Sequence, residues 1–257
     1  RILNIAVFRK ETLYQKMRAL IIYLVISAVF IGCTPILSID ASTQSVYHFS
    51  DTDKNISLLD ISETFGTYDG SFVLYDNNLD SWKIYDLEEA TKRIPPESTY
   101  KIYDALLGLE SGIITPEHSS MTWNGDAFPF PSWEADQDLN SAMQNSVNWY
   151  FQAIDSQLGI NRVQEFLNKI EYGNQTTSSN LDLYWSDFSL KISPLEQVTL
   201  LKKFNTNEFH LNSQNVFSVK NAIKIASTPN GNFYGKTGTG RVNGQDINGW
   251  FIGYVET

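Results

Sequence analysis

"IPPESTYKIYDALLGLESG", residues 94–112, places a serine three residues before a lysine at the start of an apolar run. Two prolines precede the run, and apolar residues recur behind it at intervals of three and four, which predicts a buried helix. Because residues i and i+3 share a helix face, Lys101 is expected to reach the hydroxyl of Ser98. Burial would lower the lysine pKa and leave a neutral base beside a hydroxyl, and the free N–H groups of the helix start can stabilise an oxyanion. The stretch therefore predicts a nucleophilic serine.

Two further polar motifs follow along the chain. In "QNSVNWYF", residues 144–151, Ser146 and Asn148 interrupt an apolar stretch, and both can face one site only where a helix starts or breaks. "YGKTGTG", residues 234–240, places Lys236 on an expected strand, and serine-reactive penicillin enzymes combine Ser-x-x-Lys with Lys-Thr-Gly. Taken singly, the three motifs also fit a helix cap, an exposed helix face and a solvated turn. Their occurrence together in this order predicts one catalytic site.

The apolar pattern predicts a mixed α/β domain of the α+β type. "GSFVLYD" (70–76) and "SWKIYDL" (81–87) have the signal of a β-hairpin, and helical spacing then continues to "SPLEQVTLLKKF" (193–204). "NFYGKTGTG" (232–240) and "DINGWFIGYVE" (246–256) predict two antiparallel strands joined by a glycine-rich turn. Because strands come first, helices next and strands last, we expect the two strand groups to share one sheet.

The amino-terminal part predicts a membrane anchor. Residues 1–18 are basic, and residues 19–39 contain no charge. The uncharged segment is long enough to cross a hydrocarbon core of about 30 Å. The basic side is expected in the cytoplasm, followed by the transmembrane helix, a linker over 40–60 and an extracellular domain over 61–257. Two alternatives are a cleaved signal peptide and a lipid attached at Cys33, in "FIGC".

Composition limits the function classes further. The 257 residues, 42% of them hydrophobic, suffice for one sizeable core, and a net charge of −10 argues against nucleic acid as a partner. Cys33 is the single cysteine, so no intramolecular disulfide can form. The histidines, His48, His118 and His210, are isolated, and we expect no metal site. The chain begins with Arg1 rather than Met, which we interpret as the later piece of a longer protein.

The motifs together resemble one family. "GSFVLYD", "PESTYKI", "AMQNSVNWYFQ", "EYGNQ", "YWSDFSLKISPLEQ" and "YGKTGTG" are similar to the class D, oxacillinase-type β-lactamases, and most closely to the extracellular sensor domain of the penicillin-sensing Bla and Mec signal transducers. The resemblance covers residues 61–257, with "YGN" at 172–174 and Trp185 as specific class D marks. It implies a serine β-lactamase or penicillin-binding transpeptidase-like fold, with a central antiparallel sheet and helices on both sides. A further strand and a closing helix of that fold are expected to follow Thr257.

The resemblance also implies the roles of the catalytic residues. Ser98 matches the acylated nucleophile, Lys101 the base and Ser146 the proton-relay serine. The Lys101 amine can take up carbon dioxide as an N-carboxylysine, which Trp185 would hold; no other cofactor is expected. Hydrolytic members of class D usually have an apolar residue where this chain has Asn148, and the sensors have asparagine. An amide there can hydrogen-bond the uncarboxylated lysine, which would remove the base that activates water.

The substrate-binding residues come from the third motif. Lys236 and Thr237 match the pair that binds the carboxylate of the drug, and Gly238 completes the motif. The backbone N–H groups of Ser98 and Thr239 match the oxyanion hole. The covalent partners implied are β-lactam antibiotics.

The function implied is that of a membrane-anchored β-lactam sensor, acylated at Ser98 and deacylated very slowly, which signals across the bilayer to induce resistance. Its cytoplasmic partner would be an upstream zinc-metalloprotease domain of the same protein, because the present sequence has no His-Glu-x-x-His. The alternative is a membrane-tethered class D β-lactamase that hydrolyses the drug. A cell-wall transpeptidase is a weaker reading, which "YGN" and Trp185 disfavour.

Overall fold

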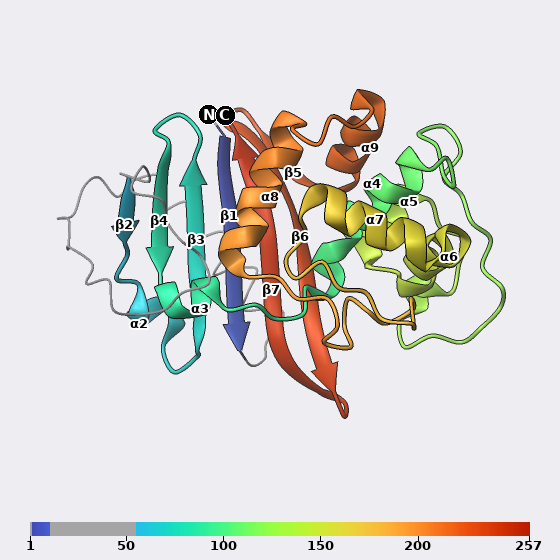
Figure 1. Cartoon of the computed structure of the whole chain (residues 1–257), viewed down its shortest axis with the longest axis horizontal. Helices are drawn as coiled ribbons and strands as arrows, with labels where there is room; N and C mark the ends of the chain where they lie inside the picture. Colours follow the sequence, from blue (N-terminus) through green and yellow to red (C-terminus); the bar gives the residue numbers. More distant parts are fainter. Residues whose placement is uncertain (1, 11–54) are drawn as a thin grey trace.

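The computed structural model describes residues 2–10 and 55–257, which form a sheet with helices gathered beside it (Figure 1). The strands are β1 (Ile2–Lys10), β2 (Ile56–Leu58), β3 (Gly70–Asp76), β4 (Ser81–Tyr85), β5 (Lys224–Thr228), β6 (Gly231–Val242) and β7 (Gln245–Glu256). They follow the order β2-β4-β3-β1-β7-β6-β5 in one sheet, so strands from both ends of the sequence do share it, as expected. Neighbouring strands are antiparallel except β2 and β4, which are parallel.

Strand β1 lies in the middle of this sheet, antiparallel to both β3 and β7. Ile5 and Ala6 are fully buried and belong to the hydrophobic clusters on opposite faces of the sheet. The sequence predicted residues 1–18 as one basic cytoplasmic segment, whereas the structure places residues 2–10 in the sheet. The expectation rested on charge alone, whereas the run "ILNIAVF" combines β-branched and aromatic residues that favour a strand.

The helices begin and end at local signals. The helical segments are α2 (Ser62–Phe65), α3 (Leu87–Thr91), η1 (Glu97–Tyr100), α4 (Lys101–Glu110), η2 (Pro131–Trp133), α5 (Leu139–Asn145), α6 (Asn148–Leu158), α7 (Ile160–Ile170), α8 (Pro194–Thr206) and α9 (Ser213–Ala222). Helix α8 begins with a capping box, in which Ser193 accepts from the Glu196 N–H and the Glu196 carboxylate accepts from the Ser193 N–H. Pro194 occupies the first turn, where its missing N–H costs no hydrogen bond.

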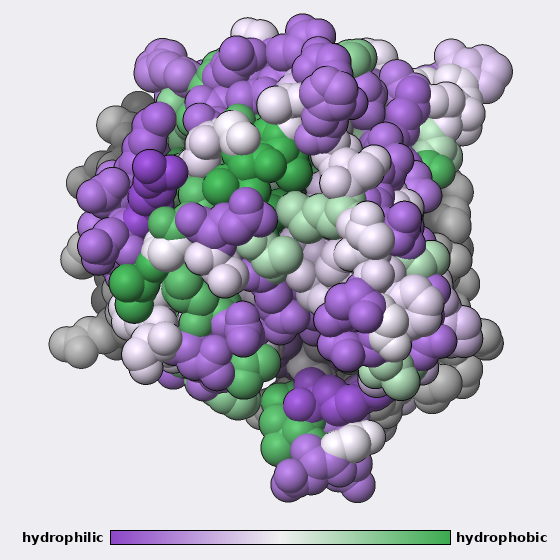
Figure 2. Space-filling view, turned by 90° about the vertical axis from the view of Figure 1, so that its right-hand side faces the viewer, coloured by the Kyte–Doolittle hydropathy of each residue, from purple (hydrophilic) through white to green (hydrophobic). Residues whose placement is uncertain are grey.

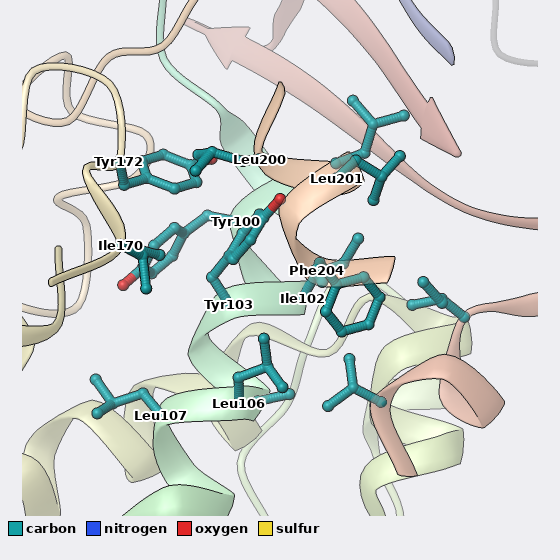
Figure 3. Close-up of a cluster of buried hydrophobic side chains, with 14 of the residues drawn as sticks. Tyr100, Ile102, Tyr103, Leu106, Leu107, Ile170, Tyr172, Leu200, Leu201 and Phe204 are labelled. Atoms are coloured by element: carbon teal, nitrogen blue, oxygen red, sulfur yellow. The ribbon is translucent and has the colours of Figure 1, made fainter. Parts of the chain in front are cut away.

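Helix α4 is the centre of the larger core (Figure 3), because every residue from Lys101 to Leu109 is buried. The Tyr100 and Tyr103 rings both meet Tyr172 edge to face, with centroids 5.2 and 5.1 Å apart. A β-carbon on Gly108 would lie 2.9 Å from a methyl of Ile154, so only glycine lets α4 approach α6 this closely. The packing fixes the helix that carries the expected base.

A smaller cluster packs on the opposite face of the sheet. It consists of Ile5, Phe65, Phe72, Leu74 and Phe251. Among the described residues, the helix that contributes to this cluster is the four-residue α2, which supplies Phe65. The expectation of helices on both sides is therefore met unequally, and the sites discussed below all lie on the side of the larger core.

The expected membrane segment lies outside the described residues, as does most of the linker expected over 40–60. Strand β2 falls inside that linker and pairs with β4, so the folded domain begins before the expected boundary at residue 61. Over residues 2–10 and 55–257, none of the helices has the length and apolar character that crossing a bilayer requires.

The surface at the helical end of the molecule is mixed. Figure 2 shows hydrophilic areas that surround smaller hydrophobic ones. Large apolar side chains are exposed at separate places in the fold, for example Phe130 and Phe188 in loops and Phe217 on α9. Scattered residues of this kind are normal for a soluble surface and do not by themselves mark an interface.

Candidate active site

The turn from η1 into α4 brings Ser98 and Lys101 into contact, as expected from their spacing. Side chains three apart eclipse each other in a 3₁₀ turn, and Lys101 Nζ lies 2.8 Å from Ser98 Oγ. Lys101 is only 1% exposed, whereas Ser98 is half-buried and accessible from outside. The Ser98 hydroxyl is therefore accessible to solvent, whereas the Lys101 amine in contact with it is not.

The backbone around Ser98 is fixed from both sides. Glu97, immediately before it, has a φ of 53°, in the left-handed region that few residues other than glycine adopt. Its N–H donates to the Trp185 carbonyl at 3.0 Å, and Trp250 Nε1 donates to the Pro95 carbonyl at 2.8 Å. Because strained residues persist only where surrounding contacts hold them, these bonds account for the sharp turn that presents Ser98.

The second motif lies at a helix break, as its sequence spacing required. Helix α5 ends at Asn145, Ser146 has a left-handed φ of 58°, and α6 begins at Asn148. Asn148 Oδ1 accepts a hydrogen bond from Lys101 Nζ at 2.7 Å, and Ser146 Oγ accepts one from Lys236 Nζ at 2.7 Å. The break thus lets both polar side chains face the same site.

The third motif lies on β6, directly against the nucleophile turn. A β-carbon on Gly238 would lie 3.1 Å from the Pro96 carbonyl oxygen and 3.2 Å from the Ser98 backbone nitrogen. Glycine therefore lets the strand run close to the turn. Lys236 also donates to the Thr237 carbonyl at 2.9 Å, and Thr239 is exposed at the rim. Of the residues expected to bind substrate, Gly238 therefore adjoins Ser98, and Lys236 adjoins Ser146.

Burial controls the charge of the two lysines. It lowers the pKa of Lys101 to about 7, and the acidic groups of Asp104 and Glu97 only partly oppose this effect. It also lowers the pKa of Lys236 well below its usual value, and the charge of Lys101 lowers it further. Lys101 is therefore divided between amine and ammonium near neutral pH, as a general base must be.

Trp185 lies where the resemblance implies, beside the base. Lys101 Nζ is 5.6 Å from the centre of a Trp185 ring and 5.7 Å from that of Phe151. Trp185 also stacks on Tyr100 with centroids 6.3 Å apart. These rings exclude water from the amine, which explains the burial that lowers its pKa.

The "YGN" motif acts at a distance from the nucleophile. Gly173 has a φ of 50°, and a β-carbon there would lie 2.0 Å from the Lys191 carbonyl oxygen, so no larger residue fits. Asn174 Nδ2 donates to the Ser189 carbonyl at 2.7 Å, and its Oδ1 accepts from the Lys191 N–H at 2.9 Å. The motif holds the segment that follows Trp185 and so helps to position that wall of the site.

Three buried acids belong to this region and were not identified from the sequence. Glu97 is 5% exposed, and burial raises its pKa to about 8. Asp104 on α4 and Asp155 on α6 are fully buried, and burial raises the pKa of each. The sequence signal for the two aspartates is that each interrupts a wide apolar helix face.

The structure indicates no metal centre among the residues it describes. Over residues 2–10 and 55–257, no three His, Cys, Asp or Glu side chains converge as a metal site requires. His118 and His210 are both exposed and lie in separate loops.

Comparisons with known proteins give a consistent result. The family model described as the penicillin binding protein transpeptidase domain matches residues 66–257. The regulatory protein BlaR1 of Bacillus licheniformis is 44% identical over 260 residues, which cover 100% of this chain and 43% of that protein. The chain therefore spans less than half of that relative. The methicillin resistance mecR1 protein of Staphylococcus aureus (strain Mu50 / ATCC 700699) is 36% identical over 257 residues, with the same two coverages of 100% and 43%.

Solved structures agree with the sequence matches. The C-terminal domain of the Bacillus licheniformis BlaR penicillin-receptor superposes with a TM-score of 0.72 at 41% identity, covering 78% of this chain and 87% of that one. A class D β-lactamase from Bacillus subtilis gives a TM-score of 0.68 at 30% identity, covering 77% and 89%. These similarities confirm the resemblance to penicillin-sensing regulators and to class D β-lactamases.

Proposed function

Because the chain belongs to the penicillin binding protein transpeptidase family, we propose that it is the receptor part of a β-lactam sensor that induces resistance. Penicillins and cephalosporins acylate it at Ser98. One observation carries the proposal: Lys101 Nζ lies 2.8 Å from Ser98 Oγ and 2.7 Å from Asn148 Oδ1. The contact with Ser98 places the base for acylation. The contact with Asn148 keeps the same amine from serving as the base for hydrolysis of the acyl ester.

Acylation follows from the arrangement of the base and the nucleophile. Ser98 Oγ forms a bond to the carbonyl carbon of the lactam ring, and its proton moves to the neutral Lys101 amine. The backbone N–H groups of Ser98 and Thr239 stabilise the negative oxygen that results. The ring C–N bond then breaks, and the ring nitrogen takes the proton from the Lys101 ammonium by way of the Ser146 hydroxyl, which accepts a hydrogen bond from Lys236 Nζ at 2.7 Å; Lys101 returns to the free amine.

The drug is held by the strand beside the nucleophile. Its carboxylate binds the Lys236 ammonium and the Thr237 hydroxyl, a charge-assisted contact of the kind that orients anionic ligands. Gly238 presents no side chain, so the acyl group can lie along β6 next to the turn.

Slow release of the acyl group follows from Asn148. Hydrolysis of the ester needs a base a second time, to activate water. A carbon dioxide adduct of Lys101, held beside Trp185, would serve as that base, but its carboxylate oxygens would repel Asn148 Oδ1. Asn148 therefore favours the free amine of Lys101 over its carbon dioxide adduct. Without that base the ester is not hydrolysed, and the acyl group stays on Ser98. The second candidate is a class D hydrolase, which the intact set of Ser98, Lys101 and Lys236 also allows.

We propose that residues 19–39 cross the membrane in the full-length protein, with the bilayer and an upstream cytoplasmic zinc-metalloprotease domain as partners. If the chain crosses the bilayer once between Lys10 and Asn55, these two residues lie on opposite sides of the membrane. In the structure β1 and β2 belong to one sheet, which places both residues on the same side. The membrane-inserted protein therefore requires β1 to leave the sheet. Protease added outside intact cells should release a fragment containing Ser98; full protection, with an outward control protein cleaved, would contradict this topology.

The experiment that tests the function uses the full-length protein in membranes and a labelled penicillin. Intact-mass spectrometry should find one adduct, absent in Ser98→Ala and present in Ser218→Ala, which removes a half-buried hydroxyl on α9. After a chase, the adduct should survive for on the order of an hour, which corresponds to a barrier of about 22 kcal/mol. An adduct in Ser98→Ala would refute the site, and release within seconds would favour the hydrolase.

A further inference from the structure

Two buried carboxyl groups lie behind the base, and the mechanism above does not use them. Asp104 is on α4, one turn after Lys101, and Asp155 is on α6; both side chains are 0% exposed. The two carboxyl groups are in hydrogen-bonding contact with each other. Two acids that are closed off from water and touch each other need a physical explanation, because neither can be solvated.

The hydrogen bonds available to the pair are too few for two carboxylates. Tyr184 Oη donates to Asp155 Oδ1 at 3.4 Å. Asp155 Oδ2 and both oxygens of Asp104 have no donor among the residues that the structure describes. A proton on one carboxyl group would bond to the other and satisfy two of these oxygens together. Two bare carboxylates would instead repel each other in a medium of low polarity.

We propose that Asp104 and Asp155 share one proton and carry a single negative charge, which determines how readily Lys101 gives up its own proton. The inference rests on the proposed function, because it concerns the base of the acylation step. Both aspartates are positioning residues: they act through Lys101 and do not touch the ligand.

Lys101 is the cation whose charge acts on the pair of aspartates. Tyr184 and Tyr100 face the pair, but burial raises the pKa of each well above its usual value and keeps both neutral. Asp182, from the loop before Tyr184, contributes a further negative charge at a greater distance. The charge of Asp104 acts in turn on Lys101 and opposes the effect of burial.

The charge on the pair has a direct consequence for the acylation rate. With one negative charge nearby, the pKa of Lys101 stays at about 7, and the rate should be half-maximal near that pH. Without the charge of the pair, the effect of burial on the Lys101 pKa would be opposed less, and the midpoint would move to lower pH. An opposite charge at close range typically moves a pKa by about one to three units.

Asparagine substitutions can count the charges. In Asp104→Asn or Asp155→Asn, the new amide donates to the remaining carboxylate and replaces the shared proton, so one charge remains. Both charge and proton are lost in the double variant. We expect the pH midpoint of acylation by a fluorescent penicillin to stay within about half a unit in each single variant. In the double variant it should fall by about one unit or more. Asp182→Asn, in an exposed loop, is the matched control.

Each outcome decides a different point. If the pH midpoint of acylation moves in the single variants, the pair of aspartates carries two charges. If the midpoint stays in the double variant, the pair carries none. Either result overturns the proposal. If the unsubstituted full-length protein is not acylated at any pH, the proposed function fails instead.

A second measurement does not depend on acylation or on the folding of the double variant. Infrared spectra at pH 7, taken in a Glu97→Gln background because Glu97 is itself protonated there, should show one buried protonated carboxyl band. Each single variant should lose this band. Its persistence in both single variants would refute the shared proton.

Discussion

Replacing Asn148 by valine removes the oxygen that competes for the base. In the structure this oxygen accepts from Lys101 Nζ at 2.7 Å, the other partner of the amine being Ser98. A hydrogen bond to a charged group contributes about 1.5–3 kcal/mol, and each 1.4 kcal/mol corresponds to a factor of ten. If the bond opposes carboxylation of Lys101 by that amount, Asn148→Val should release the acyl group about 10 to 100 times faster.

The assay is a pulse of labelled penicillin followed by a chase with unlabelled drug, on the full-length protein in membranes. Added bicarbonate should speed release in Asn148→Val, because carbon dioxide is the second reactant, and should have little effect on the unsubstituted protein. Asn145→Val makes the same chemical change at the exposed end of α5 and is the control.

Two results would refute this reasoning while leaving the receptor function intact. One is an adduct whose lifetime is the same with Asn148 and with valine. The other is faster release that does not respond to bicarbonate, because the base that activates water would then not be a carbamate.

Three further predictions concern Glu97 and two glycines. Burial raises the pKa of Glu97 from 4.5 to about 8, so the folded protein keeps a proton that the unfolded chain releases between these values, and stability falls as pH rises through them. Glu97→Gln should therefore be more stable in urea unfolding by about 1.4 kcal/mol per pH unit over this window, reaching at most about 5 kcal/mol at pH 8. Gly173→Ala should cost at least about 3 kcal/mol, whereas Gly112→Ala, which has a similar positive φ after the end of α4 but open space around it, should cost only about 1 kcal/mol; equal losses would show that backbone strain alone matters. Gly238→Ala should slow acylation about tenfold without unfolding the domain, because the strand must move by a few tenths of an ångström from Ser98; an unchanged rate would remove the close approach from the mechanism.

The parts of the site that depend on local geometry could be predicted from the sequence. Ser98 and Lys101 are three residues apart on one turn, and the break between Ser146 and Asn148 follows from helix periodicity. The approach of Ser146 to Lys236, 90 residues later, could be expected only from the combination of motifs and the family resemblance. Nothing in the pattern of either segment alone defines that contact.

The remaining features depend on packing that a sequence pattern does not specify. The basic residues around the apolar run Ile2–Phe8 suggested a cytoplasmic segment, and the strands that pair with β1, β3 and β7, lie far along the chain. Acids are usually exposed, so a sequence pattern does not indicate that Asp104 and Asp155 are buried. Their burial follows from the approach of α4 and α6, which only the folded structure shows.

The two lysines of the site make ligand binding a proton-uptake reaction. Burial holds the pKa of Lys236 well below its usual value and the charge of Lys101 lowers it further, so both effects disfavour the ammonium form of Lys236 in the empty site. An anionic carboxylate that enters the site stabilises the ammonium, and the proton must come from the buffer. Calorimetry of a non-reactive, ring-opened penicillin in buffers of different ionisation enthalpy should therefore give apparent heats that change in proportion to the buffer. The affinity should weaken as pH rises, whereas acylation needs the neutral Lys101 amine and should slow as pH falls, so binding and acylation respond to pH in opposite directions.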